Sequence, residues 1–300
     1  GFEDGVGKGG GTVKTAYGIE FSVYRQLRDI ADNPAIAPLL NSISSQEFGD
    51  DYGDYYLATG RRVGYRTAIG GRGDVRFTVT SERIKSQTIH ATPASGAYRL
   101  NPAVLDDDYT FATITLRRRS EGFAVRRDLA AEISLEGGGS ADSMLYGRLS
   151  GSGHMLLPVG SNHLLVRGEF GIGTTDLPPH RAFVLGGRST LLGDEFREWG
   201  GRAAALIHVE WRTPVPFISL AVGPGRTPGT ITLAPYVAAG WADRQIDVIP
   251  TPWAVTPGTR MTLGIGAEWL GVFRIEAGYG VQSHNAHVAF DVTRDFWDIL

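Results

Sequence analysis

Serine and histidine side chains of the kind used in nucleophilic catalysis stand close together at one point of the sequence. Ser150 and Ser152 lie just before His154, and a serine hydroxyl needs a neighbouring imidazole to take up its proton. No carboxylate that would orient the histidine can be assigned, and the Gly-x-Ser-x-Gly turn of many hydrolases is missing. We therefore expect a protein that is not an enzyme.

Patterns that would indicate a metal site or a phosphate-binding loop are incomplete. His284 and His287 flank a tight turn without a carboxylate at ligand spacing, and the segment GVGKGGGT near the N-terminus lacks the spacing of a phosphate-binding loop. Two acidic clusters suit Ca²⁺ at a lipid surface or plain solvation, at Asp50, Asp51 and Asp54 and at Asp106–Asp108. We expect neither a cofactor nor a metal ion.

Composition narrows the class of protein and its partners. The net charge is −3 and the arginines are spread along the chain, so the clustered basic charge of a nucleic-acid-binding protein is absent. The 300 residues include no cysteine, which suits a chain that crosses an oxidising compartment. No apolar run is long enough for a membrane-spanning helix.

The dominant pattern is an alternation of apolar and polar residues with period two, which predicts strands with one apolar face. Leu164, Val166 and Phe170 form one such row, and Arg167 and Glu169 belong to the other. The pattern predicts about twelve strands, at 12–26, 54–69, 74–88, 109–118, 124–136, 142–157, 163–173, 203–212, 230–242, 261–270, 273–281 and 287–296.

The predicted strands have the length that a tilted strand needs to cross a bilayer, about nine to eleven residues. Long connections at 27–53, 89–108, 177–201 and 243–259 all fall at one end of the sheet, and tight turns such as 70–73 and 158–162 fall at the other. Outer-membrane barrels have this arrangement. The sequence thus predicts an all-β, antiparallel transmembrane β-barrel that occupies residues 1–300 as one domain, with 1–11 as a flexible lead-in. A soluble β-sandwich or soluble β-barrel is the alternative.

A segment rich in glycine and charge precedes the eighth predicted strand, FVLGGRSTLLGDEFREWGGRAAALIHVEWRTPVP from Phe183 to Pro216. It resembles the BamA/TamA-like superfamily of outer-membrane barrels, also called the bacterial surface antigen family, in which an inward-folded loop precedes a strand that carries a glutamate. The matching residues are Leu185, Gly186, Gly187, Gly193, Phe196, Gly200, Gly201, Glu210 and Arg212. The candidate loop motif also includes Arg188, Asp194 and Arg197. Family barrels have sixteen strands, and five of them follow this loop. In this chain five predicted strands also follow the loop, but only seven precede it.

The resemblance implies that the loop folds into the lumen with Gly193 at its tip, near the strand that bears Glu210. The family usually has an arginine directly before that glycine, and this chain has Leu192. The ion pair between loop and barrel wall is therefore not expected at this position, and Arg188 or Arg197 is a substitute that would pair with a lumen carboxylate such as Glu210. Gly193 itself suggests a positive φ or a close backbone approach.

The last predicted strand resembles the C-terminal signal of outer-membrane barrels. Phe290 and Val292 lie on one face, and Phe296 takes the place of the usual terminal aromatic residue because the chain continues to Leu300. Such a signal implies insertion by an assembly machinery.

Two functions follow from the resemblance, both in the bacterial outer membrane. The first is a barrel that helps to insert or translocate polypeptides. The second is a non-catalytic anchoring or pore-forming barrel whose activity lies in a separate domain or partner. The expected partners are outer-membrane lipid, lipopolysaccharide, and periplasmic or other outer-membrane proteins.

The sequence leaves two possibilities for how the sheet closes into a barrel. The first and last predicted strands, 12–26 and 287–296, would run antiparallel to each other if the strand number is even, so they can pair directly. Strands supplied from elsewhere are the alternative.

Overall fold

A computed structural model describes the chain over residues 17–30, 36, 38–88, 92–119, 129–142, 144–219, 221–222, 225–227 and 229–292. The predicted lead-in 1–11 lies outside these residues. Within them, no helix is long and apolar enough to cross a membrane.

Twelve long antiparallel strands form one continuous sheet, which confirms the predicted fold class and strand number. They are β1 (Tyr17–Asp29), β2 (Tyr55–Ile69), β3 (Gly73–Ser86), β4 (Asp107–Arg118), β5 (Leu129–Ser140), β6 (Leu145–Val159), β7 (Asn162–Gly173), β10 (Ala203–Pro216), β13 (Thr230–Asp243), β14 (Arg260–Trp269), β15 (Phe273–Gly280) and β16 (Ala286–Val292). Seven of these strands precede the segment between β7 and β10, and five follow it.

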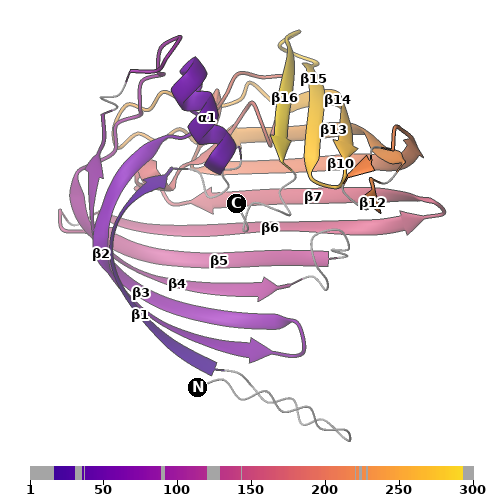
Figure 1. Cartoon of the computed structure of the whole chain (residues 1–300). Coiled ribbons are helices and arrows are strands. Elements are labelled where there is room, and N and C mark those ends of the chain that lie inside the picture. The colour runs from indigo at the N-terminus through magenta and orange to yellow at the C-terminus, as the bar shows by residue number, and fades with distance from the viewer. Residues whose placement is uncertain are drawn as a thin grey trace, which may run out of the picture.

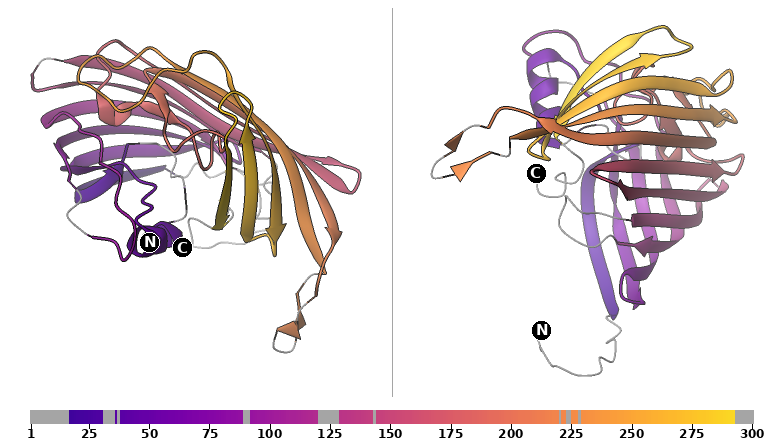
Figure 2. Two further views of the ribbon diagram at one scale, coloured as in Figure 1. Left: turned by 90° about the horizontal axis from the view of Figure 1, so that it is seen from above. Right: turned by 90° about the vertical axis from the view of Figure 1, so that its right-hand side faces the viewer.

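The sheet is strongly curved, and the segment between β7 and β10 lies on its concave side (Figures 1 and 2). Each long strand pairs with the next long strand along the chain, in the order β1 to β16. Among the described residues this order contains no pairing between β1 and β16, and the direct closure of the sheet stays a prediction.

The long connections between strands gather at one end of the sheet, as the sequence predicts. Because every neighbouring pair is antiparallel, the connections after β1, β3, β7 and β13 share one end, which we call the long-loop end. At the opposite end the turns after β2, β6 and β14 are short, and residues with positive φ such as Gly70, Gly160 and Leu270 allow the chain to reverse there. The connection from β10 to β13 departs from this rule, since it extends into a small hairpin of β11 (Ala221–Val222) and β12 (Gly225–Arg226).

The two faces of the wall differ as the alternation predicts. On β7 the large apolar side chains of Phe170 and Ile172 remain 46% and 41% exposed on the convex face, whereas Leu165 on the other face is buried. The same convex row continues over the neighbouring strands and includes Val63, Phe77, Ile114, Leu135, Ile207, Trp211, Val237, Trp241, Leu263, Ile275 and Tyr279. We call this surface the apolar belt.

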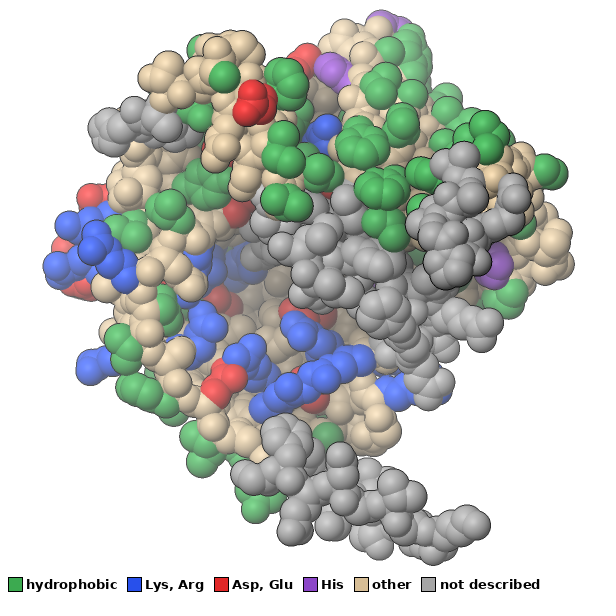
Figure 3. Space-filling view, viewed as in Figure 1, with side chains coloured by type: hydrophobic (Ala, Val, Ile, Leu, Met, Phe, Trp, Pro, Cys, Tyr) green, Lys and Arg blue, Asp and Glu red, His purple; other side chains and the backbone are tan. Residues whose placement is uncertain are grey.

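The concave face is polar and charged over β1 to β5 (Figure 3). Its side chains pair across strands: Arg66 contacts Asp74 at 3.1 Å, and Arg117 contacts Glu132 at 2.5 Å. A sheet that exposes its apolar side chains outward and pairs its charges inward has the surface of a membrane barrel with a hydrated lumen.

One helix interrupts the first long connection, which the sequence predicted only as a loop. Helix α1 (Pro38–Phe48) begins with a proline, whose missing N–H costs nothing at this position. It ends at Gly49, whose φ of 76° and hydrogen bond to the Ser45 carbonyl oxygen terminate the helix. The helix leads the chain back to Tyr52 and Asp54, which contact the segment between β7 and β10.

Candidate functional site

The segment between β7 and β10, residues 174–202, forms an inward loop. Gly186 and Gly187 have φ values of 116° and 73°, which side chains other than glycine rarely allow, and they turn the chain after β8 (Phe183–Leu185). Strand β8 pairs with β9 (Trp199–Gly201) to close the loop. Leu191, fully buried, belongs to a cluster with Leu206 of β10 and Tyr236 of β13. The loop is therefore packed on the lumen face of the wall.

The tip of the loop, Gly193, lies against β14 and β15. Its N–H donates to the Thr262 hydroxyl at 3.2 Å, and its carbonyl oxygen accepts from the Ser283 hydroxyl at 2.7 Å. A Cβ atom on Gly193 would lie 2.1 Å from the backbone nitrogen of Gly280. The glycine is thus required by a close approach and not by a positive φ. The expected neighbour, the strand of Glu210, is separated from these strands by β13.

An ion pair joins the loop to the wall, although none is expected beside Leu192. Asp194 is 3% exposed and accepts two hydrogen bonds from Arg260 of β14, at 2.6 and 3.2 Å. The indole N–H of Trp199 donates to the same carboxylate at 2.9 Å, and the Arg260 guanidinium lies 4.8 Å above the Trp199 ring. The loop supplies the carboxylate and the wall supplies the cation, which is the reverse of the arrangement that the resemblance implies.

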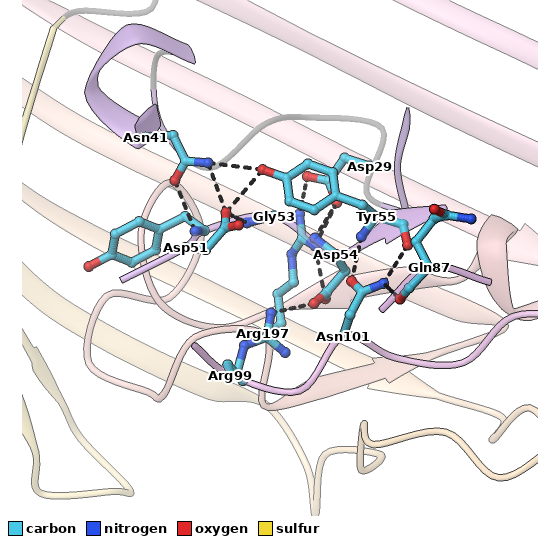
Figure 4. Close-up of polar contacts among 11 residues, drawn as sticks. Asp29, Asn41, Asp51, Gly53, Asp54, Tyr55, Gln87, Arg99, Asn101 and Arg197 are labelled. Atoms are coloured by element: carbon cyan, nitrogen blue, oxygen red, sulfur yellow. Dashed lines mark hydrogen bonds and ion pairs between the residues drawn. The ribbon is translucent and has the colours of Figure 1, made fainter. Parts of the chain in front are cut away.

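Arg197 anchors the other side of the loop to the end of β1 and to Asp54, directly before β2 (Figure 4). Its guanidinium makes a two-pronged contact with Asp29 at the end of β1, and it lies 2.9 Å from Oδ2 of Asp54. Both Arg197 and Asp54 are buried. Burial alone would lower the pKa of Arg197, but the hydrogen bonds and charges of Asp29 and Asp54 outweigh it and raise that pKa above its ordinary value.

Two backbone N–H groups link the segments that carry Asp29 and Asp54 independently of Arg197. Ile30 donates its N–H to the Asp54 carbonyl oxygen at 2.8 Å, and Asp54 donates its own to Oδ1 of Asp29 at 3.0 Å. Arg99, from the connection between β3 and β4, also contacts Asp54. Asn101 extends the network by hydrogen bonds to the backbone of Tyr55 and Gln87 (Figure 4). The first two long connections therefore form one preorganised receptor for Arg197.

Aromatic and cationic side chains complete the contact with the first connection. Phe196 packs edge-on against Tyr52, with ring centroids 5.3 Å apart. Arg188 lies over the same tyrosine at 4.6 Å, and its Nη1 is 3.9 Å from Asp291 of β16. Arg188 and Arg197 thus both contact carboxylates, as the sequence suggested for one of them, but neither of these partners is Glu210.

Glu210 has its own cations. This carboxylate is completely buried on β10 and accepts from Arg212 at 2.9 Å and from Arg274 of β15 at 2.8 Å. His208 contacts it at 3.2 Å. Arg212 continues to Glu268 of β14, so the network crosses the wall from β10 to β15. Glu210 and Arg212 are lumen-wall residues, and their functional role stays a prediction.

The residues that suggested other chemistry lie in the lumen wall and at a turn of the long-loop end. Ser150 and Ser152 line a lumen cavity of about 340 Å³ together with Glu136 and Arg148, and the Ser150 hydroxyl accepts from Arg148 at 3.4 Å. His284 hydrogen-bonds the Tyr279 hydroxyl at 2.9 Å. In the C-terminal strand Phe290 is on the convex face, while Phe296 and the side chain of Val292 lie outside the described residues.

Sequence reasoning missed the wall and receptor residues Arg260, Asp29, Tyr52 and Asp54 as partners of the loop. They are separated from it by many residues, and their types are common in strand ends and loops. The only signal was indirect: Asp54 belongs to an acidic cluster, for which solvation is the favoured interpretation and a Ca²⁺ site the alternative.

A buried histidine lies beside this site. His180, in the short helix η2 (Pro179–Arg181), is 1% exposed and packs between Tyr56 and Tyr109, with ring centroids 5.2 and 4.9 Å away. Neither ring nitrogen has a hydrogen-bond partner among the described residues. Burial, and then the charge of Arg181, lower the pKa of His180 well below its ordinary value.

We expect this histidine to make the fold sensitive to acid. Its pKa is lower in the folded state than in the unfolded state, where it is about 6.5. Stability is therefore lost as the pH falls below that value, at about 1.4 kcal/mol per pH unit until the folded pKa is reached. Between pH 7 and pH 5, the wild type should therefore lose more unfolding free energy than His180→Phe in urea titrations.

Tyr109→Phe is the matched control, because it removes another buried polar atom without a partner from the same cluster but no group that titrates in this range. It should leave the pH dependence unchanged. An acid sensitivity that persists in His180→Phe would contradict the assignment.

Comparisons with known proteins support the fold. No family model matches the chain, and a search of curated proteins finds no relative. The crystal structure of BamA from Haemophilus ducreyi lacking POTRA domains 1–3 is similar, with a TM-score of 0.57 and 11% identity over 92% of this chain. The chain resembles the BamA barrel in fold. It spans 59% of the length of that structure. CdiB from Acinetobacter baumannii gives a TM-score of 0.49 at 13% identity, over 93% of this chain and 47% of the CdiB chain.

Proposed function

We propose that the protein is a non-catalytic outer-membrane barrel of the assembly or translocation type, which helps polypeptides to enter or cross the membrane. The observation that carries the proposal is the inward loop, which contacts β1 and Asp54, directly before β2, through Arg197, β14 through Asp194, and β15 through Gly193. A loop attached to both halves of the wall couples them, as a barrel that changes shape around a client would require.

The surface of the barrel supports its place in a membrane. The apolar belt exposes large aliphatic and aromatic side chains on strand after strand, and such a surface is stable against hydrocarbon rather than water. Outer-membrane lipid and lipopolysaccharide are accordingly the proposed neighbours of the convex face. Periplasmic or other outer-membrane proteins are the proposed partners at the two ends.

Purified protein in liposomes tests this function. A urea-denatured small outer-membrane barrel is added as client, and its folding is followed by the electrophoretic shift of folded barrels. We expect several-fold faster folding than in empty liposomes. The acceleration should be lost in Gly193→Val, because the added Cβ has no room against Gly280 and displaces the loop tip.

The same liposomes decide between the two functions. A trapped fluorescent solute reports a pore independently of client folding. If the solute leaks and client folding is no faster than in empty liposomes, the anchoring or pore-forming alternative replaces the proposal.

A further inference from the structure

The last strand of the sheet has one sheet neighbour among the described residues, β15, which leaves one edge of β16 to consider. Which backbone groups face this edge follows from the hydrogen bonds of the preceding turn. Gly280 donates its N–H to the Asn285 carbonyl oxygen, so the backbone groups of Gly280 point toward β16. Backbone groups alternate sides along a strand, so the even-numbered residues of β15 face β16.

The register then identifies the groups on the outer edge. Gly278 pairs with His287, Glu276 with Ala289 and Arg274 with Asp291. These odd-numbered residues of β16 therefore point their N–H and C=O groups at β15. Phe290 lies between two of them, and its carbonyl group points away from β15, to the edge where a further strand would pair.

A side chain of the inward loop donates a hydrogen bond to this carbonyl oxygen. Nη1 of Arg188 donates to the Phe290 carbonyl oxygen at 2.8 Å. The guanidinium is held in place by the Tyr52 ring at 4.6 Å and by Asp291, and the Arg188 side chain is only 15% exposed. Gly187, with its φ of 73°, sets the direction in which the chain enters Arg188. The arginine is thus preorganised at the strand edge.

We propose that Arg188 is an edge cap: it takes the place of a backbone N–H of β1 at the Phe290 carbonyl group and so opposes direct pairing of β1 with β16. An antiparallel strand at this edge would donate a backbone N–H toward the same oxygen. A guanidinium hydrogen bond is stronger than the neutral bond it replaces. Arg188 must therefore leave the Phe290 carbonyl group before β1 and β16 can pair at this position. This inference does not depend on the proposed function.

Disulfide crosslinking across the seam tests the cap in the full-length protein in liposomes. One cysteine replaces Val288 on β16, and a second replaces Phe21 or Val23 on β1, in separate double variants. All three side chains are exposed on the convex face, so the changes leave the lumen intact. In the Arg188→Ala background we expect the yield of β1–β16 crosslinks to rise at least threefold over the same cysteine pair with Arg188 present.

Arg202→Ala is the matched control, because Arg202 also donates to a backbone carbonyl group, that of Gln245, away from β16. Its crosslinking yield should equal that of the parent. An unchanged yield in Arg188→Ala would overturn the proposal, and a lower yield would make Arg188 a bridge that draws the strands together. Arg188→Gln, which keeps part of the stem and a weaker neutral donor, repeats the comparison if the alanine variant does not fold.

Discussion

Replacing Asp194 by alanine is expected to detach the inward loop from β14 and to destabilise the barrel by about 3 kcal/mol. The change removes the acceptor of both Arg260 hydrogen bonds and of the Trp199 indole N–H, all in a site that is less than one-tenth exposed. Removing one partner of a buried ion pair commonly costs about 3 to 5 kcal/mol, because the other charge is left without compensation. We take the lower limit because Arg260 begins β14 at the long-loop end.

A double-mutant cycle separates the ion pair from other effects. Arg260→Ala should cost much less in the Asp194→Ala background than in the wild type, since the cation no longer has its partner. Asp194→Asn is the matched variant, because its amide oxygen still accepts from Trp199 while the charge is lost. Urea unfolding in detergent gives the free energies, and protease cleavage within residues 186–198 reports whether the loop is released. Additive effects of the two alanine changes would rule out the coupling.

The long strands and the two faces of the wall could be predicted from the sequence because each depends on local alternation. Arg167 and Phe170 lie on opposite faces of β7, because successive side chains alternate and the two positions differ by an odd number. The number of strands on either side of the inward loop followed from the same counting. Helix α1 was missed, since a short helix within a long connection has no extended apolar periodicity to reveal it.

The loop partners could not be predicted, because they depend on long-range geometry. Leu192 predicts the loss of a loop-to-wall ion pair, yet Asp194 two residues later makes one with Arg260. A sequence motif fixes which residue is charged at one position, but an ion pair requires only opposite charges at the same place in space. Exchanging the sign of both partners preserves the contact and removes the motif.

Positive φ at a non-glycine residue shows how the tertiary contacts determine the conformation of the loop. Arg197 has a φ of 50°, which costs a non-glycine residue about 1 to 2 kcal/mol. Its salt bridges to Asp29 and Asp54 stabilise that conformation. Sequence propensity would place a glycine or asparagine at such a position, so the backbone turn at Arg197 was invisible before the structure.

The second large effect is expected at Glu210, where one buried carboxylate serves two arginines. Glu210→Leu would leave Arg212 with Glu268 and Arg274 with Glu276, each cation having lost one of two carboxylate partners. Because Glu210 is completely buried, water cannot replace it without opening the wall.

We expect Glu210→Leu to lower the free energy of unfolding by about 3 to 5 kcal/mol, and Glu210→Gln to lower it by less because the amide oxygen still accepts a hydrogen bond. Glu276→Gln is the matched control: Glu276 also contacts Arg274, at 3.0 Å, but it is partly exposed and contacts no second arginine among the described residues. Glu276→Gln should lower the free energy of unfolding by only about 1 kcal/mol. If Glu210→Leu and Glu276→Gln destabilise the barrel equally in urea titrations, Glu210 is one member of a diffuse charge network, and the wall from β10 to β15 does not depend on it.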